Sequence, residues 1–172
     1  KDGKKEGTWE FFHATGTVSA MGDFSGDHES GKWSYFYPSG ALQSTGMFSG
    51  GKKEGAWKLY YPDGNLLGEG NYVQGTGPYR EYYLSGALKL EGQMTDEKQD
   101  GLWKYYQEDG HMEAECRFES GQGEYIGYFS NGAVKTRGII EDGKKQGTWE
   151  IYELNGDLVG YYKPIYDASP QL

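Results

Sequence analysis

Residues 55–66 read Gly-Ala-Trp-Lys-Leu-Tyr-Tyr-Pro-Asp-Gly-Asn-Leu, and variants of this stretch return along the chain. Alignment of the repeats on Trp57 places an aromatic residue two positions after a glycine in each of seven repeats, at spacings of 24, 24, 22, 24, 22 and 24 residues, and another glycine follows each of these aromatics after seven residues. A fixed period of this length indicates a repeat protein in which each repeat is one supersecondary unit. The seven aromatics are Trp9, Trp33, Trp57, Tyr79, Trp103, Tyr125 and Trp149.

The repeat pattern predicts a β-hairpin with aromatic rings on both faces of its first strand. Tyr60 comes three residues after Trp57, and because side chains alternate along a strand, the two rings point to opposite faces. In the second half of the repeat, small or apolar residues alternate with polar ones, which is typical of a strand with one wet face. A glycine in the middle of that half, such as Gly46, leaves a slot over which a neighbouring ring can lie.

Two kinds of turn join these strands. Pro62-Asp63-Gly64 predicts a type I turn followed by a bulge, because glycine supplies the left-handed backbone that the bulge needs. The other connection reads as long at residues 50–55 and as two residues shorter at 75–77 and 121–123, which accounts for the 22-residue periods. These two shorter repeats carry tyrosine in place of tryptophan, and we expect their tight turn to leave less room for an indole.

The sequence therefore predicts an all-β fold, an elongated single-layer antiparallel meander of seven stacked β-hairpin repeats about 65 Å long. In such an array each repeat contacts only its neighbours, and the ends need caps. We assign residues 1–160 to the array and residues 161–172 to a C-terminal cap and tail, because Tyr162 and Pro164 break the pattern. We expect Asp167 to Leu172 to be loose.

Composition limits the classes of partner. The net charge of −9 disfavours nucleic acid and anionic membrane surfaces, because both attract positive protein surfaces. No run of about 18 apolar residues is present to span a membrane. A single cysteine, Cys116, cannot form an intramolecular disulfide.

The residues that carry chemistry are scattered. His13, His28 and His111 fall in three different repeats, without the close spacing of metal ligands. Cys116 occupies the slot position of its repeat, which favours a small buried side chain over a nucleophile. Gly50-Gly51 lacks the spacing of a phosphate-binding loop. We expect no catalytic, metal or cofactor site and no enzymatic activity.

Lysine pairs recur at three of the longer connections, as Lys4-Lys5, Lys52-Lys53 and Lys144-Lys145. They could form a basic ridge for an anionic partner. We favour solvated turns, in which lysine also discourages unwanted pairing of strand edges.

The aromatic faces are the strongest binding candidates, because a single-layer sheet cannot bury both of its faces and exposed aromatic patches mark partner sites. The pattern weakens where tryptophan is replaced by tyrosine, and a shallow groove is expected there. The candidate partner-binding residues are Tyr79, Tyr83, Tyr105, Tyr125 and Phe129.

The motif in residues 55–66 resembles the MORN repeat, and more closely the variant repeats of bacterial YwqK-type antitoxin proteins. The resemblance extends over about residues 1–160. It implies a β-meander with a binding or scaffolding role, and for the antitoxin group it implies neutralisation of a toxin. It supplies no catalytic motif.

Our first hypothesis is a non-enzymatic protein-binding scaffold, antitoxin- or immunity-like, whose partner is a toxin or another basic protein that complements the negative charge. A cell-surface glycan-binding protein is the alternative, because rows of aromatic rings stack on sugars. A third reading makes the repeats an appendage of a larger protein, since the chain starts at Lys1. The compartment is either the bacterial cytoplasm or, if an upstream signal has been removed, the periplasm or cell surface.

Overall fold

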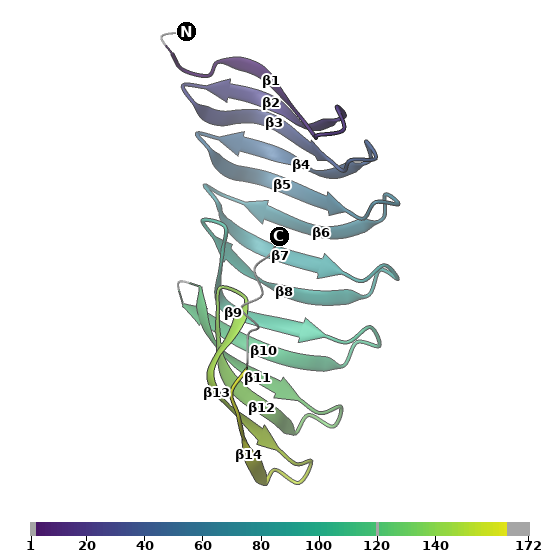
Figure 1. Cartoon of the computed structure of the whole chain (residues 1–172), viewed down its shortest axis with the longest axis vertical. Helices are drawn as coiled ribbons and strands as arrows, with labels where there is room; N and C mark the ends of the chain where they lie inside the picture. Colours follow the sequence, from purple (N-terminus) through teal and green to yellow (C-terminus); the bar gives the residue numbers. More distant parts are fainter. Residues whose placement is uncertain (1–2, 120, 165–172) are drawn as a thin grey trace.

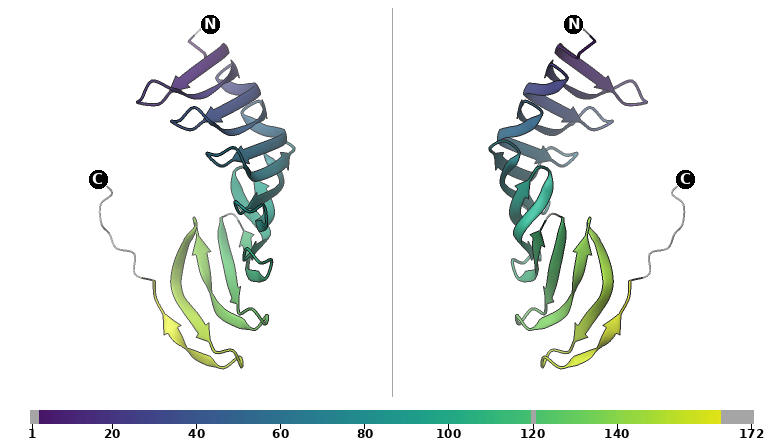
Figure 2. Two further views of the ribbon diagram at one scale, coloured as in Figure 1. Left: turned by 90° about the vertical axis from the view of Figure 1, so that its right-hand side faces the viewer. Right: turned by 90° about the vertical axis from the view of Figure 1, so that its left-hand side faces the viewer.

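The computed structural model describes residues 3–119 and 121–164, which form one open antiparallel sheet of fourteen strands in chain order (Figure 1). The prediction of an all-β single-layer meander is confirmed. The sheet is elongated and curved (Figure 2). Its strands are β1 (Gly7–Phe12), β2 (Val18–Ser25), β3 (His28–Phe36), β4 (Leu42–Ser49), β5 (Lys52–Tyr60), β6 (Leu66–Tyr72), β7 (Thr76–Tyr82), β8 (Leu88–Thr95), β9 (Lys98–Tyr106), β10 (Met112–Glu119), β11 (Gln122–Tyr128), β12 (Val134–Glu141), β13 (Lys144–Tyr152) and β14 (Leu158–Tyr162).

A three-residue turn, such as residues 62–64, follows the first strand of each repeat and has the predicted form. Gly64 donates its N–H to the carbonyl of Tyr61 at 2.9 Å, and Tyr61 donates to the carbonyl of Asn65 at 2.8 Å. Gly64 has a φ of 90°, which only glycine adopts without strain. The same pair of hydrogen bonds closes all seven of these turns, at Gly16, Gly40, Gly64, Gly86, Gly110, Gly132 and Gly156.

The turns at the other end of the strands correct the sequence prediction, because they do not differ in length. Ser49 pairs with Lys52 in a 24-residue repeat, and Val73 pairs with Thr76 in a 22-residue repeat, so each turn holds two residues. The two additional residues lie in the strand that follows. Gly46 faces the three residues 55–57, whereas Gly70 faces Tyr79 alone.

This bulge brings each tryptophan onto the preceding hairpin. Gly55 opens the bulge with a φ of 64°, and the Trp57 ring then lies flat against Gly46, where an added Cβ would overlap it. The indole N–H of Trp57 donates to the carbonyl of Met47 at 2.9 Å. The same stacking joins four pairs, Gly22 with Trp33, Gly46 with Trp57, Gly92 with Trp103, and Gly138 with Trp149.

The core lies on the tryptophan side of the sheet, in two clusters. The first contains Ala20, Phe24, Trp33, Trp57 and Tyr72, and the second contains Trp103, Cys116 and Phe118. Met94 packs against both. The opposite face mixes polar side chains with exposed apolar ones such as Met21 and Met47, and there tyrosine hydroxyls bind glutamates on neighbouring strands, as Tyr82 does with Glu69 at 2.8 Å.

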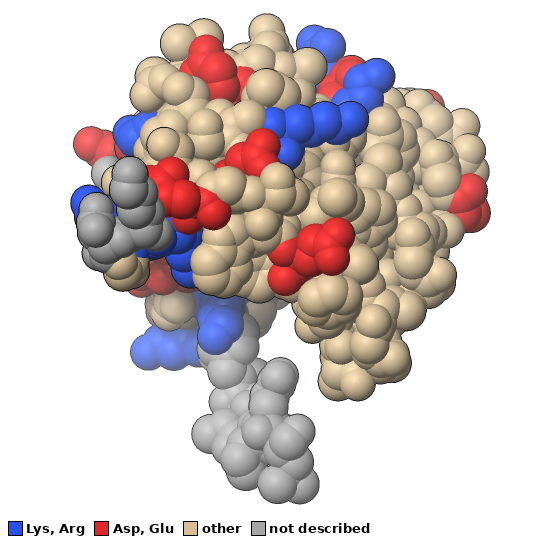
Figure 3. Space-filling model, turned by 90° about the horizontal axis from the view of Figure 1, so that it is seen from above, with Lys and Arg blue, Asp and Glu red and all other residues tan. Residues whose placement is uncertain are grey.

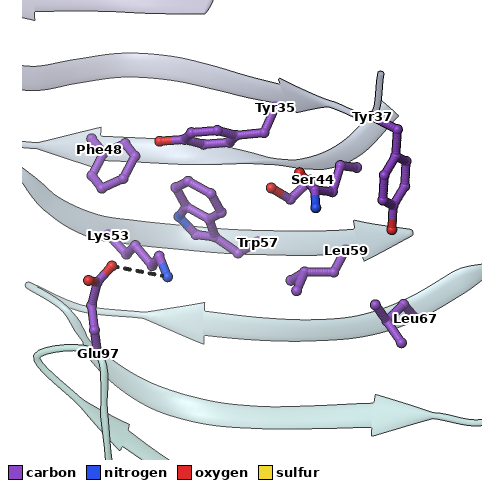
Figure 4. A pocket seen from close by; sticks show the side chains of 10 residues that line it. Tyr35, Tyr37, Ser44, Phe48, Lys53, Trp57, Leu59, Leu67 and Glu97 are labelled. Carbon is purple, nitrogen blue, oxygen red and sulfur yellow. Dashed lines mark ion pairs between the residues drawn. The ribbon is translucent and has the colours of Figure 1, made fainter. Parts of the chain in front are cut away.

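The sheet curves toward its tryptophan side. The β8–β9 turn extends past the β6–β7 hairpin to the β4–β5 turn. There Lys52 forms an ion pair with Asp96 at 2.9 Å, and Lys53 forms an ion pair with Glu97 at 3.3 Å. Because the second pair lies beside Trp57, the aromatic side is the concave side of the curve (Figures 2 and 4).

The last strand closes the array differently from the others. Tyr162 lies opposite Trp149, at the register position that glycine holds opposite Trp33, and its hydroxyl accepts a hydrogen bond from Lys145 at 2.7 Å. β14 crosses the predicted boundary at residue 160. The division into array and cap stays a prediction, and Asp167 to Leu172 lie outside the described residues.

Candidate functional site

An open groove of about 350 Å³ crosses the concave face between β3 and β6 (Figure 4). We call it the aromatic groove. Its floor and walls come from consecutive strands, with the turn after β8 at one end. The residues that define it here are Tyr35, Phe48, Lys53, Trp57, Leu59 and Glu97.

The floor of the groove consists of rings that fix one another. The Phe48 ring meets Trp57 edge-on, with centroids 4.9 Å apart, and Tyr35 tilts against Trp57 at 6.4 Å. Tyr35 also stacks on Trp33 at 6.0 Å, because residues two apart in a strand share a face. Trp33 and Trp57 are buried, so this surface is formed before any ligand arrives.

The two ends of the groove differ in polarity (Figure 4). At the end near the two-residue turns, Lys53 pairs with Glu97, and its ammonium lies 5.2 Å from the centre of the Trp57 ring. At the other end, Leu59 and Leu67 form an apolar wall beside Tyr37, whose hydroxyl donates to the carbonyl of Tyr60 at 2.8 Å. A ligand would therefore meet charge at one end and apolar surface at the other.

The phenol of Tyr35 lies near negatively charged side chains. Burial, and after it the nearby carboxylates of Glu29 and Glu97, raise the pKa of Tyr35 to about 12. The phenol stays protonated at neutral pH, and the carboxylates lie at the same end of the groove as the Lys53 ammonium. Viewed from the N-terminal end, charged side chains gather on the side of the two-residue turns. The side of the three-residue turns carries few charged side chains (Figure 3).

The predicted site residues fall into two groups. Tyr79, Tyr105 and Tyr125 are half-buried and pack against the second core cluster, where Tyr105 and Tyr125 lie 6.3 Å apart. Burial is the main cause that raises the pKa of all three phenols. Their role in partner binding stays a prediction.

The other two predicted residues lie at the start of three-residue turns. Tyr83 donates its hydroxyl to the carbonyl of Tyr106 at 2.7 Å, as Tyr61 does one repeat earlier with Tyr82. Phe129 occupies the equivalent position without a hydroxyl, and the Lys135 ammonium lies 5.9 Å from its ring centre. The structure therefore separates Tyr83 and Phe129 from the other three.

Sequence reasoning missed the aromatic groove itself. A usable signal was the residue two positions after each tryptophan, which shares its face and is aromatic or aliphatic at Tyr35 and Leu59. The contribution of Glu97 had no such signal, because it depends on the curvature that brings the β8–β9 turn to Lys53.

The lysine pairs agree with the prediction of solvated turns only in part, because the first lysine of each pair is exposed. The second lysine of each pair lies over the tryptophan four residues later, with the ammonium 5.4 Å from the ring centre for Lys5, 5.2 Å for Lys53 and 4.3 Å for Lys145. Cation–π contacts at such exposed or partly buried sites stabilise by about 0.5–1 kcal/mol. These lysines cover the aromatic face instead of forming a basic ridge.

The remaining reactive groups are accounted for by packing. Cys116 is fully buried, and burial first, then Glu124, raises the pKa of its thiol to about 12. Among residues 3–119 and 121–164, no three His, Cys, Asp or Glu side chains gather as metal ligands would. The same part of the chain holds no helix long and apolar enough to cross a membrane.

Three segments match the MORN repeat variant, namely residues 29–49, 53–74 and 99–120. They coincide with the β3–β4, β5–β6 and β9–β10 hairpins. A search of curated proteins found no match. The chain thus contains repeats similar to the MORN repeat variant in a β-hairpin scaffold, and two of these three matched segments form most of the aromatic groove.

Proposed function

We propose that this chain is a non-enzymatic protein-binding scaffold, and that the aromatic groove holds a segment of its partner. The observation that carries the proposal is the groove of about 350 Å³ lined by Tyr35, Phe48 and Trp57. Aromatic side chains in well-packed pockets supply most of the binding free energy in protein interfaces. Because these rings are already fixed by one another, little ordering free energy is lost on binding.

The shape and charge of the sheet support the same proposal. Repeat arrays use extended concave surfaces to bind partners, and the groove lies on the concave side. The net charge of −9 favours a basic partner, because complementary charge raises the association rate and excludes acidic competitors. Within this role we favour an antitoxin- or immunity-like protein that captures a basic toxin, as the resemblance to antitoxin repeats implies.

The proposal is tested by capture from an extract of the source organism, with three baits compared by quantitative mass spectrometry. The baits are the wild-type chain, the groove variant Tyr35→Ala/Leu59→Ala, and the matched variant Lys58→Ala/Tyr60→Ala, which changes the neighbouring residues on the opposite face. We expect one partner to be retained by the wild type and the matched variant and lost by the groove variant. Equal retention by all three baits would remove the groove assignment, provided that circular dichroism shows all three folded.

Glycan binding is the second candidate, and the row of tilted rings formed by Tyr35 and Trp57 favours it because such rings stack on sugar faces. Sedimentation with purified cell wall separates the two. Co-sedimentation that the groove variant loses, without any protein partner, would replace the protein-binding proposal. A wild-type chain that stays in the supernatant would remove the glycan candidate.

A further inference from the structure

The chain places its own cation over the tryptophan in three of its five tryptophan repeats. The residue four positions before the tryptophan is Lys5, Glu29, Lys53, Gln99 or Lys145. Each lysine of this series lies over its tryptophan and over at least one further ring, such as Phe24 for Lys5 at 4.7 Å, Tyr72 for Lys53 at 5.8 Å and Tyr162 for Lys145 at 5.4 Å. The position is therefore a cation site that the fold repeats.

Glu29 reverses the charge at this site in the second repeat. In the strand register, Lys53 lies directly opposite Phe48, and Glu29 lies directly opposite Phe24. Directly opposed residues of antiparallel strands share a face. The Glu29 carboxylate thus lies on the concave face where the next repeat has an ammonium.

Phe24, which lies opposite Glu29 in the register, is covered by Lys5, whereas the next rings toward the groove have no cation from the chain. In the described part of the protein, no lysine or arginine lies over Trp33, Tyr35 or Phe48. Lys5 covers Trp9, Phe11 and Phe24, and Lys53 is held by Glu97. Glu29 makes no ion pair with any described residue.

The open volume of the groove lies next to these rings. Tyr35 and Phe48 belong to the floor of the aromatic groove, and Glu97 lies at its charged end. Glu97 is held by Lys53, and the Glu29 carboxylate lies beside Gly51 of the β4–β5 turn, and both carboxylates raise the pKa of the Tyr35 phenol. A basic side chain satisfies this arrangement, because its cation gains both ring and carboxylate contacts while its methylene stem covers apolar surface.

We propose that the charged end of the aromatic groove binds a lysine or arginine side chain of the protein partner, with the cation over Tyr35 and Phe48 and beside Glu29. The residues next to the bound side chain in the partner reach the apolar wall at Leu59. This inference rests on the proposed function and specifies the partner chemistry. Gln99 marks the fifth repeat as different, because it is neutral and its amide donates to the hydroxyl of Tyr105 at 3.4 Å.

The test uses the full ¹⁵N-labelled chain and two small probes at constant ionic strength. Nα-acetyl-arginine methylamide carries the cation, and Nα-acetyl-norleucine methylamide is its neutral counterpart. We expect the arginine probe to shift the indole N–H signals of Trp33 and Trp57 saturably, and the norleucine probe to leave them in place. Equal shifts with both probes, or no shift with either, would overturn the proposal.

Three variants sharpen the test. Glu29→Lys restores the chain's own cation and abolishes the arginine-induced shift, and Glu29→Gln weakens binding about fivefold, the effect of one exposed charge pair. Gln99→Lys makes the equivalent substitution in the fifth repeat and leaves binding unchanged. Because Glu29→Lys copies the arrangement at Lys53, we expect it to melt no lower than the wild type. Unchanged arginine binding in Glu29→Lys would overturn the proposal.

The two proposals fail separately. Capture that depends on Tyr35 and Leu59 but not on Glu29 would keep the groove as the binding surface and remove the basic side chain. Arginine binding that Glu29→Lys abolishes, without any partner captured through the groove, would keep the cation site and remove the protein-binding function.

Discussion

The indole of Trp57 lies flat against the backbone of Gly46 on the preceding hairpin, and there is no space between them for a methyl group. Gly46 is buried, and the indole N–H is bonded to the carbonyl of the next residue, Met47. The contact joins consecutive repeats, so it connects the local bulge to the cohesion of the whole sheet.

Gly46→Ala is therefore expected to destabilise the protein by about 2–4 kcal/mol, because the added Cβ overlaps a ring that has no free direction to move. Urea unfolding measures this loss. Gly160→Ala is the matched control, since a Cβ there has nothing within 4 Å, and its stability should stay within about 0.5 kcal/mol of the wild type. Equal effects of the two substitutions would mean that the ring contact does not hold the repeats together.

The bulge itself is tested at Gly55, which has a φ of 64°. Asparagine tolerates this left-handed backbone better than alanine, and valine tolerates it least. We expect stability to fall in the order Asn, Ala, Val, with valine losing about 2 kcal/mol or more. Thermal unfolding gives the order, and three equally stable variants would show that the backbone can relax around this position.

Lys53 is expected to stabilise the fold through Trp57 and Glu97 together. Lys53→Met keeps the length of the side chain and removes its charge, and the loss should be about 1 kcal/mol. The loss in Lys53→Met/Glu97→Gln should be smaller than the sum of the two single losses, because the residues are partners. Lys58→Met, on the opposite face, should have no measurable effect, and a loss equal to that of Lys53→Met would contradict the assignment.

Alkaline pH should weaken the fold through its buried tyrosines. Burial raises the pKa of Tyr35 and of Tyr125 from 10.0 to about 12. Between these pH values the unfolded chain loses protons that the folded chain keeps, so the free energy of unfolding falls as pH rises from about 10 to 12. Tyr35→Phe should reduce the slope of this fall, and the exposed Tyr161→Phe should not. A stability that is constant over this range would contradict the burial of these phenols.

The fold was predictable because its signals are local and repeated. The period, the Gly64-type turns and the alternation of faces each follow from a few neighbouring residues. The position of the two additional residues in the 24-residue repeats could not be predicted. Two residues added to the turn or to a strand bulge give the same period, and they leave Tyr79 and Trp57 on the same face. Only the register, with Gly46 opposite three residues, distinguishes them.

The site was less predictable for a physical reason. Tyr35 and Leu59 carried a readable signal, since they share a face with their tryptophans. The charged end is formed by Lys53 and Glu97, which are far apart in sequence and meet only because the curved sheet brings the β8–β9 turn over the β6–β7 hairpin. Curvature depends on the summed twist of many strands, and no single residue in the sequence indicates it.

Binding of the partner in the concave aromatic groove is tested at two neighbouring residues of β5. A photo-crosslinking amino acid is placed at position 59, which lines the groove, or at position 58, which points to the opposite face. Each chain is irradiated in an extract of the source organism. We expect one crosslinked partner from position 59 and none from position 58. The same adduct from position 58, with none from position 59, would contradict binding in the groove.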